Sequence, residues 1–516
     1  MDRLFTQALA DSFEFNSDRL CVVDLGSAGE PNRLELTYEQ VRNAAAAVTG
    51  ELDRQLGKRD ALKVGIVARN SANWVIADIA CLLGGYIAVP LPMVFSKAQA
   101  EHLAATCDGF LVDATGARTL DEKWGIETDP AKVIDLNAAH VPISTTLLRA
   151  VKPDTICKVI HTSGTTSRPK GVQITIAALQ ETLGSLCKAI PAQAHRRYLS
   201  MVPLSLLLEQ VTAIYLPLLR GGSVHFLPES CPLLGEPGAA PDDLIARLLS
   251  VRPTAVTVPP VVIDSIAAMV AGPHKHQSEI MAYWSSGVHF TCGGAIVSPE
   301  TLFYLASHGI DVFQGYGLSE NTSVVSVNTA EHQRIGSVGK PLEHVQVRIA
   351  ADNSIEVSST SLFSGYACAD PSSCSFTKDG WLDTGDLGRL DQDGFLFVHG
   401  RKKNVLCLPN GRNVSPEQVE ADLKEFSGVR EAVVFLDKAN GLVALIIGDP
   451  DLSVQRLSQW THSAFSDIER PAVLWTLAAE DKSTTKFFTV TGRPKRAEIA
   501  ETYLSCRTTK PFPEVS

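Results

Sequence analysis

The sequence predicts an α/β protein with a large N-terminal domain, a β-rich subdomain and a small α+β C-terminal domain. Two patterns favour it: β-rich runs alternate with helical runs in the N-terminal part, and short alternating strands with Asn, Asp and Gly turns follow after about residue 340. Strands that alternate with helices form mostly parallel sheets covered by helices on both faces. At 516 residues, the chain is also too long for one ordinary core.

Three stretches carry the β-α-β pattern. In residues 61–92, β-rich runs flank a helical segment that Asn70 or Ser71 can cap. Residues 198–228 contain a strand, a long apolar helix, a Gly-Gly stop and another strand, and residues 253–272 repeat the rhythm. We therefore expect mostly parallel sheets flanked by helices.

The pattern changes toward the C-terminus. Residues 345–359 and 388–401 alternate as short strands with polar turns. After Asn404 we expect a small α+β unit with a helix that has Ser415 as N-cap and Pro416 as first residue. The boundary is placed in "HGRKKN", which gives an N-terminal domain 1–400, its β-rich subdomain at about 340–400, and a C-terminal domain 401–516.

Composition and charge narrow the class of protein. Apolar residues make up 45 % and charged residues 20 % of the chain, as in soluble globular proteins. The net charge of −11 argues against general binding to nucleic acid or anionic membranes. The 11 cysteines form no C-x-x-C pair and no Cys/His cluster, so we expect reduced, structural thiols. Because no signal peptide or transmembrane run is evident, a cytoplasmic location is expected.

The strongest candidate for a ligand loop is "HTSGTTSRPKGVQIT", residues 161–175. Backbone N–H groups of a Gly-rich loop can bind phosphate oxygens together, while hydroxyls add donors and a lysine adds charge. The residues that supply these groups are Ser163, Gly164, Thr165, Thr166, Ser167 and Lys170. The same composition also marks ordinary surface turns. A P-loop NTPase is disfavoured, because Lys170 precedes Gly171 and G-x-x-x-x-G-K-[ST] is not matched.

Three further stretches fit a nucleotide site, although each alone has an ordinary structural explanation. In "FQGYGLSENTS", Tyr316 can stack on a base and Glu320 can help to hold Mg²⁺, but Gly-aromatic-Gly also marks tight turns. In "WLDTGDLG", Asp386 can accept both hydroxyls of a ribose or form an Asx turn. In "HGRKKN", three consecutive cations follow a strand, as they also do in solvated charged runs.

Together and in this order, the motifs resemble those of the adenylate-forming superfamily of acyl-CoA synthetases, firefly-type luciferases and peptide-synthetase adenylation domains. The resemblance extends from about Tyr38 to Ile499. "TSGTTSRPKGV" is similar to the phosphate loop of that superfamily, "GYGLSE" to its adenine and Mg²⁺ motif, and "TGD" to its ribose motif. "GRKKNVL...NGRNVSPEQVE" is similar to its hinge and flap, and "TVTGRPKR" to its C-terminal catalytic loop.

The resemblance implies an AMP-forming acid–thiol ligase that uses ATP and Mg²⁺. Thr166 and Glu320 would hold the metal, and Asp386 and Arg401 would bind the ribose. The implied catalytic residues are Arg493, Thr166, Glu320 and Lys403. The implied nucleotide-binding residues are Thr162, Ser163, Gly164, Thr165, Thr166, Lys170, Gly293, Gly294, Ala295, Gly315, Tyr316, Gly317, Ser319, Asp386 and Arg401.

Two half-reactions in one pocket are also implied. A carboxylate first attacks the α-phosphate of ATP to give an acyl-adenylate and pyrophosphate. The small, mobile domain then rotates about the hinge residue Lys403 and brings the flap around Gly411 to the site, where a thiol attacks the adenylate.

Several positions depart from the family pattern. Arg493 stands where the family carries lysine, and we expect it to do the work of that lysine, since arginine is also cationic and binds oxyanions. Ser167 replaces a usual glycine, Leu206 replaces a histidine or aromatic residue, and "NSIEV" lacks the Gly-Glu of relatives. These changes indicate a divergent branch.

The substrate is expected to be a medium- or long-chain fatty acid. "PLSLLLEQVTAIYLPLL" and "GRKKNVL" resemble the long-chain fatty acyl-CoA synthetases, and "LSLLLEQ" lacks an Asp or Lys as counter-charge for an amino acid. The same stretch is equally compatible with a plain core helix. Because no insertion of the kind found in fatty acyl-AMP ligases stands between Gly365 and Trp381, the resemblance implies a thiol acceptor, either coenzyme A or the pantetheine of an acyl carrier protein.

Alternatives stay open. An aryl acid is possible as substrate, and the reaction can end in acyl-AMP release or in a β-lactone. Loss of the usual lysine is also compatible with a nucleotide-binding pseudo-enzyme that acts as a sensor or scaffold.

Overall fold

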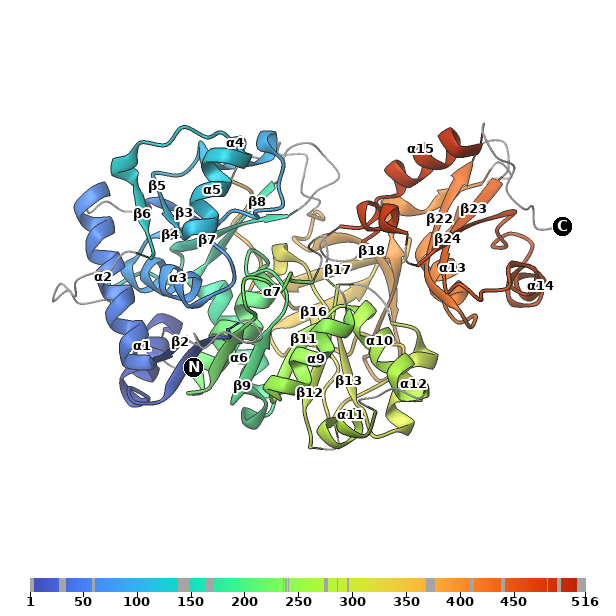
Figure 1. Ribbon diagram of the computed structural model, residues 1–516, viewed down its shortest axis with the longest axis horizontal. Coiled ribbons are helices and arrows are strands. Elements are labelled where there is room, and N and C mark those ends of the chain that lie inside the picture. The colour runs from blue at the N-terminus through green and yellow to red at the C-terminus, as the bar shows by residue number, and fades with distance from the viewer. Residues whose placement is uncertain are drawn as a thin grey trace.

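Two large sheets and three layers of helices alternate in the N-terminal part of the chain (Figure 1). The computed structural model describes residues 4–26, 34–57, 61–137, 148–162, 170–234, 236, 239, 241–272, 277–284, 286–294, 297–367, 376–408, 413–437, 441–479, 481–489 and 493–507. Within these ranges, no helix combines the length and apolarity that crossing a bilayer requires.

The larger sheet has nine strands in the order β15-β14-β13-β12-β11-β9-β10-β1-β2. Its strands are β1 Leu20–Asp24, β2 Leu34–Thr37, β9 Arg197–Ser200, β10 Ser223–Phe226, β11 Ala255–Val258, β12 His289–Cys292, β13 Val312–Tyr316, β14 Ser326–Val327 and β15 Lys340–Pro341. The central strands from β13 to β1 are parallel, and the outer pairs are antiparallel.

The second sheet has six strands in the order β6-β5-β3-β4-β7-β8. Its strands are β3 Lys63–Val67, β4 Ile87–Pro90, β5 Gly109–Val112, β6 Val133–Asp135, β7 Ile156–Thr162 and β8 Lys170–Thr175. All neighbours are parallel except β7 and β8, which form an antiparallel pair. The predicted α/β fold with mostly parallel sheets is therefore confirmed.

Helices fill the space between the two sheets and cover both outer faces. The central layer consists of α1 Phe5–Phe15, α2 Tyr38–Leu56, α3 Ala72–Gly84, α6 Ile176–Ala189, α7 Leu207–Glu209 and α8 Leu216–Leu219. The outer face of the larger sheet packs against α9 Pro241–Val251, α10 Pro260–Ala271, α11 Gln277–Trp284 and α12 Pro299–Ser307. The outer face of the smaller sheet packs against α4 Lys97–Ala104 and a segment containing α5 Ala114–Arg118.

Local signals explain where these helices begin and end. Ser71 caps α3 through its side chain, as one of the two predicted candidates, and Gly85 ends this helix in the left-handed conformation. Within the buried core, the ammonium of Lys158 on β7 pairs with Asp78 of α3. Both side chains are fully buried, so this pair fixes the strand that leads into the candidate phosphate loop.

The β-rich region forms a separate antiparallel sheet in the order β16-β17-β18-β19. Its strands are β16 Val345–Ile349, β17 Ser354–Ser359, β18 Leu382–Leu390 and β19 Leu396–Arg401. Asn353 turns the chain between β16 and β17 with a φ of 65°, a conformation in which Asn is enriched. This confirms the antiparallel strands predicted for residues 345–359 and 388–401.

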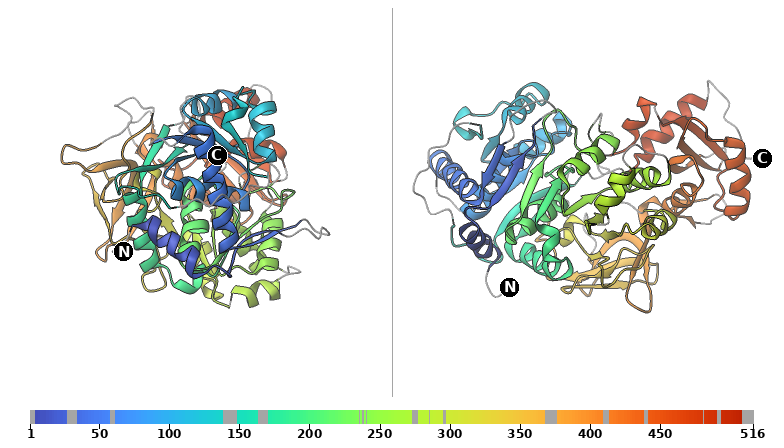
Figure 2. Two further views of the ribbon diagram at one scale, coloured as in Figure 1. Left: turned by 90° about the vertical axis from the view of Figure 1, so that its left-hand side faces the viewer. Right: turned by 60° about the horizontal axis from the view of Figure 1, so that its bottom comes forward.

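The C-terminal part forms a lobe at one end of the molecule (Figures 1 and 2). A strand pair, β20 Leu406–Cys407 with β21 Asn413–Val414, leads into a three-stranded sheet of β22 Val429–Asp437, β23 Gly441–Gly448 and β24 Val473–Ala478. Helices α13 Pro416–Leu423 and α14 Val454–Ala464 pack on one face, and α15 Arg496–Arg507 packs on the other. Ser415 and Pro416 begin α13 as predicted. The division into domains 1–400 and 401–516 stays a prediction.

Candidate active site

A buried carboxylate, Asp386, lies at the centre of the candidate site. The hydroxyl of Tyr316, at the end of β13, donates to Asp386 Oδ2 at 2.6 Å. Arg401 Nε lies 3.0 Å from Asp386 Oδ1, because the two residues pair across β18 and β19. Burial and the neighbouring carboxylate raise the pKa of Tyr316 well above its ordinary value, so its hydroxyl remains a donor. Two donors thus orient Asp386 while lone pairs of both oxygens remain for further donors.

Glycines line the ends of the neighbouring strands β12 and β13. A Cβ on Gly293 would lie 3.7 Å from the carbonyl oxygen of Gly315, so these backbones run close together. Gly294 has a φ of 91°, which favours glycine. A Cβ on Gly317 would lie 1.6 Å from the carbonyl oxygen of Ser323, so packing of the chain alone requires this glycine. Ala295 lies outside the described residues.

The turn that carries Glu320 is strained. Ser319 and Glu320 lie in a short 3-10 helix, after which Thr322 and Ser323 adopt positive φ angles of 49° and 90°. Non-glycine residues in this region occur where the surrounding structure enforces them, often at functional sites. Here Thr322 Oγ1 donates to the carbonyl oxygen of Ser361 at 2.7 Å. The turn therefore holds Glu320 in a fixed place beside β13.

The candidate phosphate loop joins two paired strand ends. Thr162 ends β7 and Lys170 begins β8, and the two residues face each other in the antiparallel register. Ser163, Gly164, Thr165, Thr166 and Ser167 lie outside the described residues. Lys170 contacts Tyr366, which in turn binds Glu320.

Tyr366 makes that connection, and the sequence motifs gave no indication of it. Its hydroxyl donates to Glu320 Oε1 at 2.7 Å. The ammonium nitrogen of Lys170 lies 5.2 Å from the centroid of the Tyr366 ring, within cation–π distance. A backbone bridge between Val172 and Tyr366 ties the segment to β8. The only local signal is a Gly-Tyr pair before residue 367, which is too short to be diagnostic.

If the site forms an acyl-adenylate, as the sequence resemblance implies, replacing Tyr366 by Phe is expected to lower the rate of that step roughly tenfold, because one hydrogen bond to a charged group contributes about 1.5 kcal/mol. The concentration of Mg²⁺ that half-saturates the reaction is expected to rise, since Glu320 loses its orienting donor. Initial rates of adenylate formation against Mg²⁺ concentration measure both effects. Tyr304→Phe, the same change on α12, serves as control, and equal rates for both variants would contradict the role given to Tyr366.

Arg493 reaches this region from the C-terminal part of the chain. Burial and the positive charge of Arg401 lower the pKa of Arg493, while Asp386, Tyr316 and Glu320 act in the opposite direction. The guanidinium stays protonated at neutral pH, since its ordinary pKa lies far higher. Its backbone N–H donates to Thr489 Oγ1 at 3.0 Å. The negative charges of Asp386 and Glu320 thus act on the Arg493 guanidinium.

Lys403, the second residue after β19, is affected by the same charges. Burial lowers the pKa of Lys403, and the positive charges of Arg401, Arg493 and Lys170 lower it further, while Asp386 raises it. Arg401, Lys403 and Arg493 therefore act on the Asp386 carboxylate, and Lys170 adds a fourth positive charge that acts on Lys403. Such an arrangement is unfavourable by itself and becomes favourable when an anion lies between the cations.

An ion pair connects the two parts of the chain beside the site. Lys424, which follows α13, lies 3.5 Å from Asp264 of α10 and 3.4 Å from Glu431 of β22. Burial raises the pKa of Asp264, and the Lys424 ammonium opposes this rise. Because Asp264 belongs to the large part and Lys424 to the small part, the pair stabilises the observed arrangement of the two.

The segment expected to contact the acid is a helix with a π-helical centre at Gln210–Tyr215, between α7 and α8. A single regular helix was expected, and π-helical turns frequently mark functional sites. Residues of the π segment are buried in the core, whereas Leu206 and Leu208 are partly exposed. Leu208 Cδ2 lies 3.8 Å from the position that a Cβ on Gly293 would take. The segment is therefore largely core, with Leu208 directed toward the glycine-lined strand ends.

Glu209 follows Leu208 and lies in the core with 1 % of its surface exposed. The Tyr198 hydroxyl lies 3.4 Å from Glu209 Oε2. Burial raises the pKa of Glu209 from 4.5 to about 8. A raised folded-state pKa means that stability is complete below the unfolded pKa and falls as pH rises through the folded pKa.

Glu209→Gln removes this titration, so the stability of the variant relative to the unmodified chain is expected to increase as pH rises from about 5 to about 8. Urea unfolding at several pH values measures the difference in free energy of unfolding. A difference that does not change with pH over this window would contradict the assignment. Glu181→Gln, on the partly exposed face of α6, serves as control.

Comparison with known proteins shows the family to which this chain belongs. The family model described as AMP-binding enzyme matches residues 9–366, which is more than half of the chain. The chain therefore belongs to the AMP-binding enzyme family, and the predicted membership of the adenylate-forming superfamily is confirmed.

Three individual proteins illustrate the similarity. Long-chain-fatty-acid--CoA ligase ACSBG2 of Gallus gallus is 27 % identical, over 74 % of this chain and 60 % of its own length, so the chain spans less than two thirds of that relative. The crystal structure of the anthranilate CoA ligase AuaEII with anthranoyl-AMP has a TM-score of 0.82 at 20 % identity and covers 98 % of both chains. O-succinylbenzoate coenzyme A synthetase (MenE) from Bacillus subtilis, in complex with ATP and magnesium ion, has a TM-score of 0.75 at 21 % identity, covering 96 % of this chain and 99 % of its own.

Proposed function

We propose that this protein activates a carboxylic acid with ATP as an acyl-adenylate and then transfers the acyl group to a thiol. The observation that carries the proposal is the convergence of Lys170, Arg401, Lys403 and Arg493 around Asp386 and Glu320. Acyl-adenylate formation needs cations where phosphate charge is redistributed and a carboxylate where the ribose hydroxyls donate. This set supplies both.

Asp386 and Arg401 bind the ribose hydroxyls, and Tyr316, Gly293, Gly294 and Ala295 flank the adenine. Gly315, Gly317 and Ser319 shape the turn beneath it. Thr162, Ser163, Gly164, Thr165, Thr166 and Lys170 surround the phosphates. The buried position of Asp386, with a donor on each oxygen, supports its role as an oriented acceptor.

Mg²⁺ fits the donor set of the site, because hydroxyl and carboxylate oxygens are the ligands it prefers. Glu320 and Thr166 would hold it, and its charge would offset that of the phosphates. The Tyr366 hydroxyl orients Glu320 through Oε1. This contact explains how a carboxylate on a turn can be positioned for a metal.

In the first half-reaction, a carboxylate oxygen of the acid attacks the α-phosphorus of ATP. The bond between the α-phosphorus and its bridging oxygen to the β-phosphorus breaks, and pyrophosphate leaves. Arg493 stabilises the negative charge on the reacting oxygens, and Lys170 stabilises that on the leaving group. Both residues act by position and charge, since neither donates a proton in the balanced equation.

In the second half-reaction, the sulfur of coenzyme A or of a carrier-protein pantetheine attacks the acyl carbon, its proton goes to solvent, and AMP leaves. The flap around Gly411 reaches the site when the small domain rotates about Lys403. The ion pair between Lys424 and Asp264 is one contact across the two parts of the chain that can open reversibly, as a rotation of the small domain requires.

A medium- or long-chain fatty acid is the proposed substrate. Leu206 and Leu208 present apolar surface near the strand ends, and neither offers a counter-charge to an amino group. An aryl acid remains the second candidate, since solved structures with this fold include aryl-acid ligases.

The proposal is tested by incubating the purified protein with ATP, Mg²⁺ and an acid panel of octanoate, palmitate, benzoate and anthranilate, with and without coenzyme A. Mass spectrometry is expected to detect AMP and an acyl-CoA with a fatty acid, and acyl-AMP when coenzyme A is omitted. Free acyl-AMP in the presence of coenzyme A would overturn the thiol step, and so would a β-lactone formed from a 3-hydroxy acid, such as 3-hydroxyoctanoate, added to the panel. ATP binding without AMP from any acid would favour a nucleotide-binding scaffold.

A further inference from the structure

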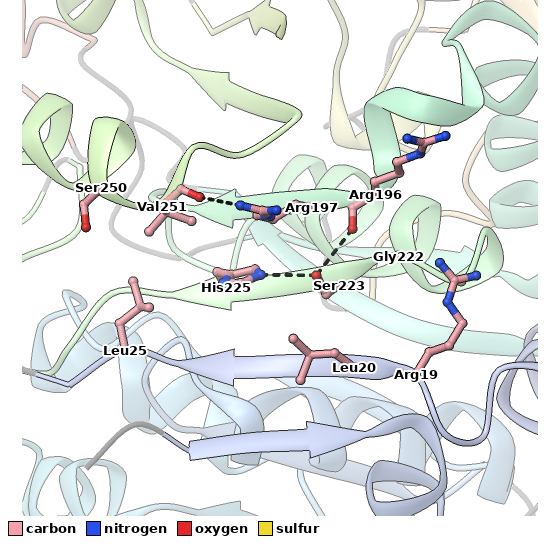
Figure 3. A pocket seen from close by; sticks show the side chains of 11 residues that line it. Arg19, Leu20, Leu25, Arg196, Arg197, Gly222, Ser223, His225, Ser250 and Val251 are labelled. Atoms are coloured by element: carbon pink, nitrogen blue, oxygen red, sulfur yellow. Dashed lines mark hydrogen bonds between the residues drawn. The ribbon is translucent and has the colours of Figure 1, made fainter. Parts of the chain in front are cut away.

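A second, basic groove lies at the opposite end of the larger sheet. Its volume is about 610 Å³, and its lining includes Arg19, Arg196 and Arg197 (Figure 3). Arg19 directly precedes β1, Arg196 precedes β9, and Arg197 is the first residue of β9. The groove thus opens near the amino ends of these parallel strands, whereas the candidate active site follows the carboxyl ends of β12 and β13.

The positive charge of this groove is not neutralised by the described part of the chain. Among the described residues, no carboxylate lines the groove and none forms an ion pair with any of the three arginines. Arg19 Nη1 donates to Asn16 Oδ1 at 3.1 Å, and Arg197 Nη1 donates to the carbonyl oxygen of Val251 at 2.9 Å. These neutral acceptors orient the guanidinium groups without cancelling their charge.

Two glycines, Gly221 and Gly222, lie where the backbone of the groove is closely packed against neighbouring atoms. A Cβ on Gly222 would lie 1.8 Å from the carbonyl oxygen of His195, so only glycine fits here. Gly221 has a φ of 66°, and a Cβ there would lie 2.8 Å from Arg19 Nη1. Figure 3 shows Arg19 and Arg196 on either side of Gly222. The Gly-Gly pair therefore leaves room for both side chains at one end of the groove.

The remaining lining supplies both polar and apolar surface. His225 Nε2 lies 3.1 Å from Ser223 Oγ on β10, and both side chains are buried in the floor. Leu20, Leu25 and Val251 add apolar walls. Guanidinium groups bind phosphate and carboxylate oxygens in pairs, and a volume of this size accommodates a nucleotide-sized molecule.

We propose that the groove lined by Arg19, Arg196 and Arg197 binds a small phosphorylated organic molecule, at a site separate from the one that activates the acid. The arginines hold its phosphate groups, and the apolar walls pack against its organic part. Because the chain has a net charge of −11, three arginines without a described carboxylate partner at this sheet edge are a local concentration of positive charge. The proposal does not depend on the function given to the first site.

The test counts bound ligand per chain by equilibrium dialysis, with radiolabelled ATP and, separately, radiolabelled pyrophosphate as probes. The double variant Arg196→Gln/Arg197→Gln is expected to lose one class of ATP sites, or to bind it roughly tenfold more weakly. Arg456→Gln, a single charge removal on the exposed face of α14, is the control and is expected to keep both classes. Arg196→Gln alone serves if the double variant does not fold, which circular dichroism reports.

The two probes separate the sources of the phosphate. Arginine-dependent binding of ATP but not of pyrophosphate assigns an organic phosphate and supports the proposal. If pyrophosphate binds to the arginines as tightly as ATP or more tightly, the groove does not recognise the organic part of the ligand, and that part of the proposal is wrong. ATP sites that all survive in both arginine variants would overturn the site itself. Acid-dependent pyrophosphate exchange, measured in parallel, is expected to stay within about twofold of the unmodified rate.

Discussion

Replacing Arg493 by Ala lowers the rate of acyl-adenylate formation by about 100- to 1,000-fold, the expected loss when one preorganised charge donor is removed from a transition state. Arg493 is the cation that the C-terminal part brings to Asp386 and Glu320. Its effect should fall on kcat rather than on the KM for ATP, because the charge it stabilises develops only during the reaction. Single-turnover formation of acyl-AMP measures this step without interference from thiol transfer.

Two further variants separate charge at this position from general damage to the loop. Arg493→Lys restores the residue that the family carries, and it is expected to retain most of the activity. Lys495→Ala removes a neighbouring cation whose ammonium lies 3.5 Å from Glu498 of α15. This variant is expected to form acyl-AMP at the rate of the unmodified protein. If Arg493→Ala and Lys495→Ala form acyl-AMP at the same rate, Arg493 does not replace the family lysine.

Replacing Asp386 by Asn raises the KM for ATP by about 100-fold, because two hydrogen bonds to a charged group contribute about 3 kcal/mol together. The amide keeps the shape of the side chain and loses its charge and half of its acceptor capacity. Arg401 and Tyr316 both contact this carboxylate, so its loss also removes a charged partner from each of these two residues. Steady-state kinetics against ATP concentration, at a saturating acid concentration, measures the effect.

Asp383→Asn is the matched control for this prediction. Asp383 lies on the same strand, β18, but its partners are Lys402 at 3.7 Å and the backbone N–H of Gly385 at 2.9 Å, rather than Tyr316 or Arg401. Its KM for ATP is expected to stay within about twofold of the unmodified value, as for substitutions away from a site. A rise in both variants would show that β18, rather than the Asp386 carboxylate, governs nucleotide binding.

Much of the fold follows from local sequence signals. Ser71 and Ser415 begin helices where capping residues precede an apolar period, and Asn353 turns the chain between two alternating strands. The π-helical segment at Gln210–Tyr215 could not be predicted, because its residues fit an ordinary apolar helix equally well. Its irregular hydrogen bonding depends on packing against residues distant in sequence, which no local pattern records.

In the candidate site, too, some residues could be predicted from the sequence and others could not. Tyr316, Asp386 and Arg401 belong to motifs, and the structure brings them together. Tyr366 was missed, because its role depends on contact with Glu320 and Lys170 rather than on its neighbours in sequence. The position of Arg493 beside the carboxylates depends on how the two parts of the chain pack, so the sequence could identify the residue but not its place.

The most direct test of the account is the exchange of radiolabelled pyrophosphate into ATP. If the site adenylates a carboxylic acid reversibly and Arg493 takes part, label enters ATP only when a suitable acid is present. The Arg493→Ala variant then loses most of this exchange. If the protein binds ATP and yet no acid of the panel supports exchange, the adenylation chemistry proposed for this site is wrong.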